Sequence, residues 1–258
     1  MPTPNRLAIV TGTSSGIGEA LTRTLLQRNW QVVGISRRAA AIDSPRYTHA
    51  ALDLGDVERL TASLTSTLTS TVADPALTRL ALVNNAADVA LHGQVDQLDP
   101  AAMMRAYAVN TVAPVVLMGW MLRNGAPGVP IRMVNVSTGA AQTPLPGLGA
   151  YATTKAALRL IGMIFAAELD MRPGPPRDVS VLSYDPGVVE TAMQRAVRDS
   201  SVERLPIVSM FQQLEAHRML RTPDVPATAI ADYLDADGHP RFKEDLFAFV
   251  PPPGGAAG

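Results

Sequence analysis

The sequence contains no cysteine, few aromatic residues and no marked excess of charge of either sign. Without cysteine there can be no disulfide, no thiolate nucleophile and no zinc–thiolate cluster. The four histidines are far apart, and none has a metal-ligand spacing such as H-E-x-x-H, so we expect no metal site. The formal net charge is −1 and the charged residues are scattered, so we expect neither a nucleic acid nor a membrane as a partner.

Long hydrophobic stretches are lacking as well. No apolar run reaches the length of a transmembrane helix, and residues 1–6 lack the apolar core of a signal peptide, so we expect a cytoplasmic protein. The 258 residues are enough for one large α/β domain. We expect this domain to cover residues 1–250, followed by a flexible tail at 251–258 whose proline, glycine and alanine cannot bury a core.

Strand-like apolar runs alternate with helix-like segments along most of the chain. Continuous Val, Ile and Leu runs between such segments are typical of a parallel sheet covered on both faces. We therefore predict an α/β fold with a doubly wound, Rossmann-type sheet of about seven strands and a ligand crevice at their carboxyl ends. The predicted strands are 7–10, 31–36, 47–52, 79–83, 131–136, 179–183 and 246–250, and the predicted helices are 17–29, 57–71, 101–124 with a break near 110–114, 151–171 and 226–235.

The segment 186–223 departs from this alternation, because its apolar residues are only loosely periodic. Two interpretations are open. The segment could cover the substrate as a lid, or its apolar side chains could simply pack it onto the domain. These side chains include Met193, Met210, Phe211, Leu214 and Met219.

A glycine-rich turn follows the first predicted strand and opens the first predicted helix. Glycine lets the backbone bend sharply and come close to phosphate oxygens, while the free N–H groups of a helix start supply donors and a partial positive charge. Such a turn is typical of a pyrophosphate site. We predict that Gly12, Ser14, Ser15, Gly16, Ile17 and Gly18 contact a dinucleotide.

Tyr151 and Lys155 open the long predicted helix 151–171, and their i,i+4 spacing places both side chains on one face. A cation beside a phenol is expected to lower the phenol pKa toward neutral, so that Tyr151 can give or take a proton. Ser137 follows the predicted strand 131–136, where its hydroxyl can meet the same substrate carbonyl. We predict these three residues to be catalytic.

The end of the second predicted strand indicates which dinucleotide is bound. An NAD-binding site of this type has an acidic residue about twenty positions after the glycine turn, to bond the ribose 2′-hydroxyl. Here Ser36, Arg37 and Arg38 occupy that region, and a hydroxyl and two guanidinium groups suit a 2′-phosphate. We therefore predict NADP(H) as the cofactor. The alternative is that the two arginines are only solvated loop cations.

Further motifs occur in order around these residues. An asparagine-rich stretch, Asn84 to Ala87, follows the fourth predicted strand, Asn110 lies within a predicted helix, and Pro186-Gly187 precedes Thr191 with the spacing P-G-x-x-x-T. Together with the glycine turn and the predicted catalytic residues, this order resembles the short-chain dehydrogenase/reductase superfamily over nearly the whole chain. Ala87 replaces the glycine usual in that family, which affects the local turn only if the backbone needs a positive φ.

The resemblance implies a role for each matching residue. Ser137 would bond the substrate oxygen, Tyr151 would give it a proton, and Lys155 would bond the nicotinamide ribose. Asn110 would hold a water that links Lys155 to solvent. Asp53 would bond the adenine amino group, with a helix-capping role as the alternative. The further implied cofactor contacts are Leu54, Asn85, Ala86, Ala87, Tyr151, Lys155, Pro186, Gly187, Val188, Val189 and Thr191.

Within the superfamily, the segments 181–194, 200–201 and 220–223 resemble sepiapterin reductases and, more closely, bacterial benzil reductases. This implies an NADPH-dependent carbonyl reductase for a small-molecule ketone, either an α-dicarbonyl or an aryl ketone. No acid in 239–246 clearly matches the aspartate with which sepiapterin reductases bind the pterin, which favours the dicarbonyl. Two alternatives stay open, an NADP-dependent secondary-alcohol dehydrogenase and a non-catalytic cofactor-sensing protein.

The resemblance also implies an assembly. Family members associate through the helix that carries Tyr151 and Lys155 and through the helix before it. We therefore expect a homodimer or a homotetramer. The apolar residues expected at this contact are Leu117, Met118, Met121, Leu158, Ile161 and Phe165.

Overall fold

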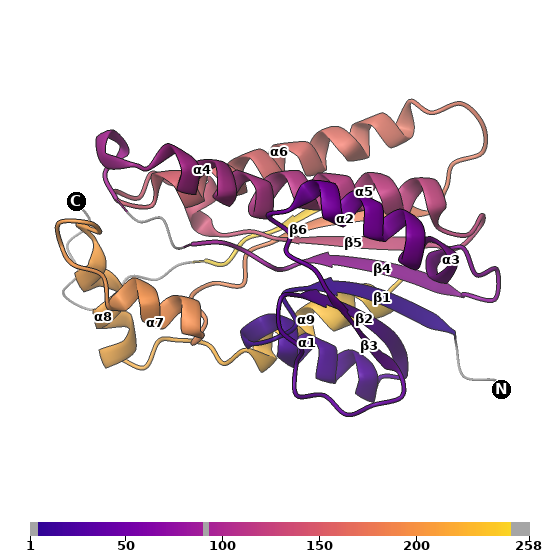
Figure 1. Ribbon diagram of the computed structural model, residues 1–258, viewed down its shortest axis with the longest axis horizontal. Helices are drawn as coiled ribbons and strands as arrows, with labels where there is room; N and C mark the ends of the chain where they lie inside the picture. The colour runs from indigo at the N-terminus through magenta and orange to yellow at the C-terminus, as the bar shows by residue number, and fades with distance from the viewer. Residues whose placement is uncertain (1–4, 90–92, 249–258) are drawn as a thin grey trace.

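The computed structural model describes residues 5–89 and 93–248, which form a sheet between two layers of helices (Figure 1). The sheet is seven-stranded and parallel throughout, with the order β3-β2-β1-β4-β5-β6-β7. This confirms the predicted Rossmann-type fold. The strands are β1 (Arg6–Thr11), β2 (Trp30–Ser36), β3 (Tyr47–Ala51), β4 (Arg79–Asn84), β5 (Ile131–Val136), β6 (Val179–Tyr184) and β7 (Phe242–Asp245).

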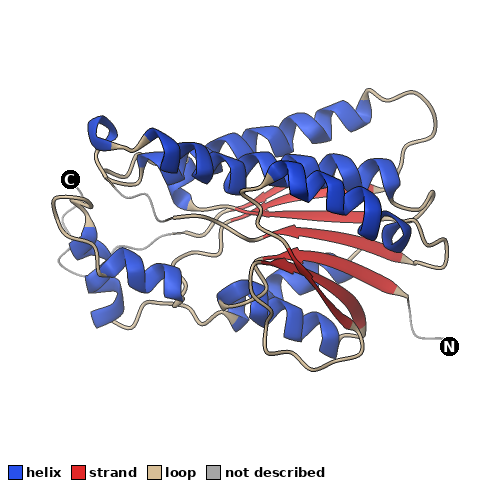
Figure 2. Cartoon of the chain, viewed as in Figure 1, coloured by secondary structure: helices blue, strands red, loops and turns tan. Residues whose placement is uncertain are grey.

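Helices cover both faces of the sheet (Figure 2). In that view α2, α5 and α6 lie above the strands, while α1 and α9 lie below them. The shorter helices α7 and α8 lie beyond the carboxyl ends of the strands. The α-helices are α1 (Gly16–Gln27), α2 (Val57–Ser63), α3 (Thr69–Val72), α4 (Pro100–Tyr107), α5 (Ala113–Asn124), α6 (Gly149–Asp170), α7 (Ala192–Arg198), α8 (Val208–Ala216) and α9 (Asp224–Asp235).

The unbroken apolar runs form strands because both faces of the sheet are buried. Side chains along a strand alternate between the faces. In β1, Leu7 and Ile9 join the core that includes residues of α2 and α5, whereas Ala8 and Val10 join the core that includes residues of α1 and α9. Because burial on both faces leaves a continuous apolar run, the predicted bounds of the five central strands agree with the observed bounds to within a residue or two at each end.

The predicted break in the helix 101–124 is confirmed. A π-helical turn, Ala108–Val112, separates α4 from α5, and Asn110 lies within it. The continuous helical stretch Pro100–Asn124 has 25 residues, and an 18-residue window within it has a mean hydropathy of 1.3, so by length and composition the stretch could cross a membrane. The expectation that no apolar stretch reaches this length is therefore wrong. Leu117, Met118 and Met121 pack this stretch into a core of the sheet.

The last predicted strand is in the wrong place. The strand is β7, Phe242–Asp245, while Leu246 and Phe247 follow it, and positions 249–250 lie outside the described residues. β7 pairs only with β6 at the edge of the sheet. An edge strand needs no continuous apolar run, because one of its sides is not covered by another strand. Phe247 instead packs against Gly187, and the predicted tail 251–258 also lies outside the described residues.

The segment 186–223 forms two helices that the sequence did not predict, α7 and α8. They pack around a small core of their own, separate from the two cores of the sheet. The predicted packing role of Phe211 and Leu214 is therefore confirmed, and the role as a lid stays a prediction. The buried members of this small core are Leu148, Val197, Leu205, Val208, Phe211 and Leu214.

Most of the residues predicted at a subunit contact lie inside the chain. Leu117, Met118, Met121 and Leu158 are at most 1% exposed, so they hold α5 and α6 to the rest of the fold and cannot face a partner. Ile161 and Phe165 are partly buried. The pattern of apolar residues did not separate the inner face of each helix from its outer face, because both faces are apolar. The outer faces carry Val115, Leu160, Met163 and Ile164.

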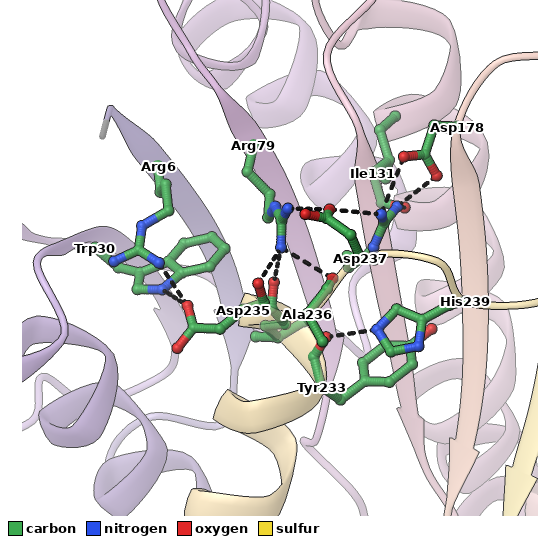
Figure 3. A network of polar contacts seen from close by, with 12 residues as sticks. Arg6, Trp30, Arg79, Ile131, Asp178, Tyr233, Asp235, Ala236, Asp237 and His239 are labelled. Carbon is green, nitrogen blue, oxygen red and sulfur yellow. Dashed lines mark hydrogen bonds and ion pairs between the residues drawn. The ribbon is translucent and has the colours of Figure 1, made fainter. Parts of the chain in front are cut away.

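A network of arginines and aspartates closes the amino end of the sheet (Figure 3). Arg79 donates to the backbone oxygens of Leu234, Asp235 and Ala236, at the end of α9. The last carbonyls of a helix lack partners within it and carry a partial negative charge, so a cation stabilises them. The Asp235 carboxylate in turn accepts from Arg6 at 2.5 Å and from the Trp30 indole at 3.0 Å. These contacts fasten α9 to β1, β2 and β4.

Arg132 is the most deeply buried member of this network, with a side chain that is 0% exposed. It lies on β5 and forms two parallel bonds to Asp178, at 2.7 and 3.0 Å. Its Nη2 also lies 3.5 Å from the Asp237 carboxylate, which accepts from Arg79 as well. The bidentate geometry fixes both the charge and the orientation of the buried guanidinium. The amino end of the sheet is thus held by paired charges.

Candidate active site

The glycine turn has the shape that the sequence predicts. Gly12 and Gly16 have φ angles of +74° and +59°, a backbone region that residues with a side chain rarely adopt. Gly18 has an ordinary φ, but a Cβ there would lie 2.3 Å from the Gly12 carbonyl oxygen. A side chain at Gly18 would therefore push the strand away from the helix. The three glycines together let α1 begin directly against the end of β1.

The start of α1 is open to a ligand. Ser15 is its N-cap residue and is extended, but its side chain makes no capping hydrogen bond. The first N–H groups of a helix have no partner within it, and their partial positive charge favours an anion. A phosphate at Gly16, Ile17 and Gly18 would satisfy these groups, so the turn fits the pyrophosphate of a dinucleotide.

The asparagine-rich stretch holds the end of β4 against this turn. The Asn85 side chain donates to the Thr11 carbonyl oxygen at 2.9 Å. The backbone N–H groups of Asn85 and Ala86 both donate to the Thr11 hydroxyl, at 2.9 and 3.0 Å. Ala87 has no positive φ, so replacing the usual glycine by alanine causes no backbone strain there.

Two arginines lie exposed where β2 ends. Within the described residues, the guanidinium groups of Arg37 and Arg38 form neither a hydrogen bond nor an ion pair. Ser36 is buried, and its hydroxyl donates to the Arg38 carbonyl oxygen at 2.7 Å. Ser36 therefore orders the loop, and the exposed side chains of Arg37 and Arg38 are available to an anionic group.

Asp53 follows β3 on the same side of the site. Its carboxylate accepts from the Gly55 N–H at 2.9 Å and from Arg105 at 3.1 Å. Partial burial opposes its charge, but these donors hold the pKa of Asp53 below its ordinary value. The helix-capping alternative is wrong, because α2 is capped by Asp56. The side chain of Leu54 is buried, so only its backbone is placed to meet a ligand.

Lys155 and Tyr151 share one face of α6, as their spacing predicts. Lys155 is 2% exposed, and its Nζ donates to the Val136 carbonyl oxygen at 2.7 Å. The same Nζ lies 5.9 Å from the centroid of the Tyr151 ring. Ser137 directly follows Val136, and its N–H donates to the Tyr184 carbonyl oxygen at 2.7 Å. Lys155 therefore reaches the end of β5 directly before Ser137, and Tyr151 lies beside Lys155 on α6.

Burial changes the proton affinity of both groups. It lowers the pKa of Lys155 to about 8. It raises the pKa of Tyr151 well above the ordinary value, and the Asp185 carboxylate raises it further. The expectation that Lys155 brings the pKa of Tyr151 toward neutral is therefore wrong for the protein alone, because burial and the Asp185 carboxylate both raise that pKa. Tyr151 holds its proton at neutral pH.

Asn110 is fully buried in the π-helical turn, and its side chain is engaged by the protein. Its amide nitrogen donates to the Asp88 carbonyl oxygen at 2.9 Å and to the Thr154 hydroxyl at 3.0 Å. Its amide oxygen accepts from the Asp88 N–H at 2.6 Å. Asn110 therefore fixes α6 beside Lys155, and both of its amide protons are used. Its role in holding a water stays a prediction.

The turn after β6 brings the segment 186–223 to the site. Gly187 has a φ of +71°, and its N–H donates to the Asp185 carboxylate at 2.9 Å. Thr191 caps α7, and its methyl group would lie 3.1 Å from a Cβ at Gly16. Between them, Val188 and Val189 pair with Arg221 through backbone hydrogen bonding and a β-bridge. The Pro186–Thr191 motif therefore lies beside the glycine turn.

Three charged residues of the site were missed by the sequence analysis. Arg105 pairs with Asp53, and Arg221 donates to the Pro186 carbonyl oxygen at 2.9 Å. Nothing in the spacing of either arginine points to these contacts. Asp185 did give a signal, because an acidic residue directly after a buried strand lies at the end of the sheet where ligands bind.

The comparisons with known proteins agree with this geometry. A family model described as short chain dehydrogenase matches residues 6–201. The chain is 30% identical over 245 residues to a benzil reductase ((S)-benzoin forming) of Bacillus cereus, covering 92% of this chain and 96% of that protein. It is 33% identical over 198 residues to L-xylulose reductase of Homo sapiens, covering 74% and 75% of the two chains. Among solved structures it is similar to the KRED1-Pglu enzyme, with a TM-score of 0.79 and 26% identity, over 93% of this chain and 100% of that one.

The chain belongs to the short-chain dehydrogenase/reductase family, whose members are oxidoreductases that act on CH–OH or C=O groups with a nicotinamide cofactor.

Proposed function

We propose that this protein is an NADPH-dependent carbonyl reductase whose substrate is a ketone, either an α-dicarbonyl or an aryl ketone. One observation carries the proposal: Lys155 bonds the end of β5 directly before Ser137 and lies beside Tyr151, at the same edge of the sheet as a glycine turn with an open helix start. The similarity to a benzil reductase over 92% of the chain supports the substrate class.

Each catalytic side chain has a distinct task in this reaction. The Ser137 hydroxyl donates to the substrate oxygen and stabilises the negative charge that develops there. Tyr151, which holds its proton at neutral pH, gives that proton to the same oxygen. Lys155 places a positive charge beside the phenol and limits the negative charge that remains after the transfer. When bound, the nicotinamide supplies the hydride.

The preference for NADPH rests on Arg37 and Arg38. Both are exposed where β2 ends, and no carboxylate directly follows β2 to bond a ribose 2′-hydroxyl. A guanidinium group can form two parallel bonds to a phosphate, which favours a cofactor with a 2′-phosphate.

We also propose that the protein is a homodimer or homotetramer, joined by the outer faces of α5 and α6. These faces carry Val115, Leu160, Met163 and Ile164, which are between 38% and 55% exposed. Neighbouring exposed apolar side chains on two adjacent helices favour association with another copy. Sedimentation at micromolar concentration tests this, and a stable monomer would contradict it.

The catalytic proposal is tested with purified protein, NADPH or NADH, and a panel of diketones, aryl ketones and the matching secondary alcohols. We expect ketone reduction with NADPH, and better turnover of α-dicarbonyls than of simple ketones. Turnover confined to an unrelated secondary alcohol would favour the alcohol dehydrogenase. Tight cofactor binding without turnover of any compound would favour the cofactor-sensing protein.

A further inference from the structure

A polar cluster connects the glycine turn to the arginine loop, the residues Arg37 and Arg38 that follow β2. The strands that contribute to it, β1, β2 and β3, lie side by side at one edge of the sheet (Figure 1). Its two hydroxyl side chains at the ends of β1 and β2 are 0% and 7% exposed, and its two side chains on β3 are partly buried. The members of the polar cluster are Thr13, Ser36, Tyr47 and His49.

The hydrogen bonds of the polar cluster have a fixed direction. The Ser36 hydroxyl has one proton, which it donates to the Arg38 carbonyl oxygen at 2.7 Å. It therefore accepts from its two other neighbours, the Thr13 hydroxyl at 3.3 Å and His49 Nε2 at 3.1 Å. The Thr13 proton is then used as well, so Thr13 accepts from the Tyr47 hydroxyl at 3.1 Å. A series of donors thus runs from β3 to the backbone of the arginine loop.

His49 holds the end of β2 at two points. Its Nε2 also lies 3.0 Å from the Ser36 carbonyl oxygen. A carbonyl oxygen can only accept, so Nε2 carries a proton in this contact. The same N–H therefore meets both the backbone and the side chain of Ser36, directly before the arginine loop. His49 fixes the point at which that loop leaves the sheet.

Gly34 leaves the room that the polar cluster needs. It lies in β2, where glycine is otherwise unfavourable because it has no side chain to pack. A Cβ at Gly34 would lie 2.6 Å from the hydroxyl oxygen of Thr13 and 2.6 Å from that of Tyr47. A side chain at this position would have to displace one of the two hydroxyl groups. The strand therefore accommodates the bond between Tyr47 and Thr13.

The glycine turn is held independently of the polar cluster. The Gly12 N–H donates to the Ile35 carbonyl oxygen at 2.8 Å, and the Asn85 side chain donates to the Thr11 carbonyl oxygen at 2.9 Å. The helix start that fits a pyrophosphate follows this turn directly. Loss of the polar cluster should therefore loosen the arginine loop and leave the pyrophosphate site in place.

We propose that Tyr47 and His49 are positioning residues for cofactor specificity. Through the polar cluster they hold the arginine loop where its guanidinium groups can bond a 2′-phosphate. A loop that is ordered before binding loses less conformational entropy on binding, so the polar cluster increases the affinity for NADPH. NADH has no 2′-phosphate and gains little from the ordered loop. This inference rests on the proposed function, since it assumes that the cofactor is NADPH.

The test compares the Kd values for NADPH and NADH, measured by calorimetry at one ionic strength, in Tyr47→Phe and His49→Ala. Each variant removes one donor of the polar cluster. The Kd for NADPH should therefore rise about threefold to tenfold, while the Kd for NADH stays within about twofold of the wild type. If His49→Ala does not fold, Tyr47→Phe, which keeps the ring, carries the same test.

Two further variants separate positioning from a general loss of stability. His49→Gln places an amide N–H within reach of the Nε2 position, so it should bind NADPH as the wild type does. Tyr233→Phe is the matched control, because it removes a phenol hydroxyl that donates to the Ser180 hydroxyl at 2.9 Å, near the amino end of the sheet. It should leave both Kd values unchanged, even if it lowers stability.

Unchanged NADPH binding in Tyr47→Phe and His49→Ala, or equal losses for the two cofactors, would overturn the inference. A loss in His49→Gln as large as in His49→Ala would overturn the role of the His49 donor. Failure of the proposed cofactor is distinguishable, because Arg37→Ala would then weaken NADPH and NADH equally. A selective loss in Arg37→Ala alone would contradict only the positioning role.

Discussion

Two groups of arginines, one at each end of the sheet, are used in opposite ways. At the amino end, Arg6 and Arg79 each donate to a carboxylate (Figure 3), and so does Arg132. At the carboxyl end, Arg37 and Arg38 have no such partner among the described residues, and the start of α1 has no side-chain cap. Charges that are neutralised within the chain stabilise the fold, whereas charges left unpaired are available to a ligand. The comparison predicts which substitutions affect activity and which affect stability.

The largest effect is expected at the carboxyl end from Tyr151→Phe. The substitution removes the proposed proton donor and keeps the shape of the ring, so turnover should fall about a hundredfold or more, while the Kd for NADPH is unchanged. Tyr107→Phe, on α4, is the matched control and should keep wild-type turnover. Near wild-type reduction by Tyr151→Phe would show that another group is the acid.

At the amino end, Arg132→Ala should lower stability without changing the chemistry. The side chain is fully buried, so the variant loses charge-assisted hydrogen bonds to Asp178 and gains a cavity. We expect a loss of about 2 to 4 kcal/mol in the free energy of unfolding, measured in urea, and unchanged kcat per folded molecule. Arg123→Ala, an exposed position on α5, is the control. Equal stability of the two variants would contradict the structural role.

Arg37→Ala makes the complementary change, because it removes an unpaired charge. A bond to the 2′-phosphate is worth roughly 1.5 to 3 kcal/mol, so the Kd for NADPH should rise about tenfold to a hundredfold. The Kd for NADH and the stability should hardly change. Arg38→Ala should lose less affinity, and all values must be measured at one ionic strength. Equal losses for both cofactors, or a wild-type preference for NADH, would show that the two arginines are only solvated.

The smallest effect concerns pH at the amino end. The hydrogen bond from Arg132 holds the pKa of Asp178 below its ordinary value of 3.8. A carboxyl group with a lowered pKa stabilises the fold above that value, and the contribution is lost as the pH falls through the folded pKa. Because the Asp178 side chain is 57% exposed, Asp178→Asn should lower stability by less than about 1 kcal/mol at neutral pH. The difference from wild type should disappear in acid, and a difference that persists there would contradict the ion pair.

The sequence predicted the sheet well because burial on both faces leaves a strong local pattern. β5, for example, has the predicted bounds, Ile131–Val136. The pattern failed for β7, whose residues Phe242–Asp245 are partly exposed at the edge of the sheet, and for α7 and α8, which pack on one another instead of on the sheet. In an element that does not pack on the main cores, apolar residues need not recur at a regular spacing, so the sequence gives no clear pattern for that element.

The candidate site was predicted where residue type and spacing determine the chemistry. Tyr151 and Lys155 share a helix face whatever the surroundings are. The direction of the Tyr151 pKa could not be predicted, since it depends on burial and on Asp185, which come from other parts of the fold. The contact between Asp53 and Arg105 likewise depends on how the end of β3 packs against α4, which no local sequence pattern indicates.

Helices α7 and α8 are held by a core of six buried side chains that is separate from the cores of the sheet. Opening this pair of helices would expose only that small cluster and leave the strands intact. Their backbone amides should therefore exchange with heavy water through local opening, well before those of β4 and β5, which are released only when the whole sheet unfolds. If the segment 186–223 covers the substrate, as one interpretation of the sequence predicts, this local opening would be the step that admits the substrate.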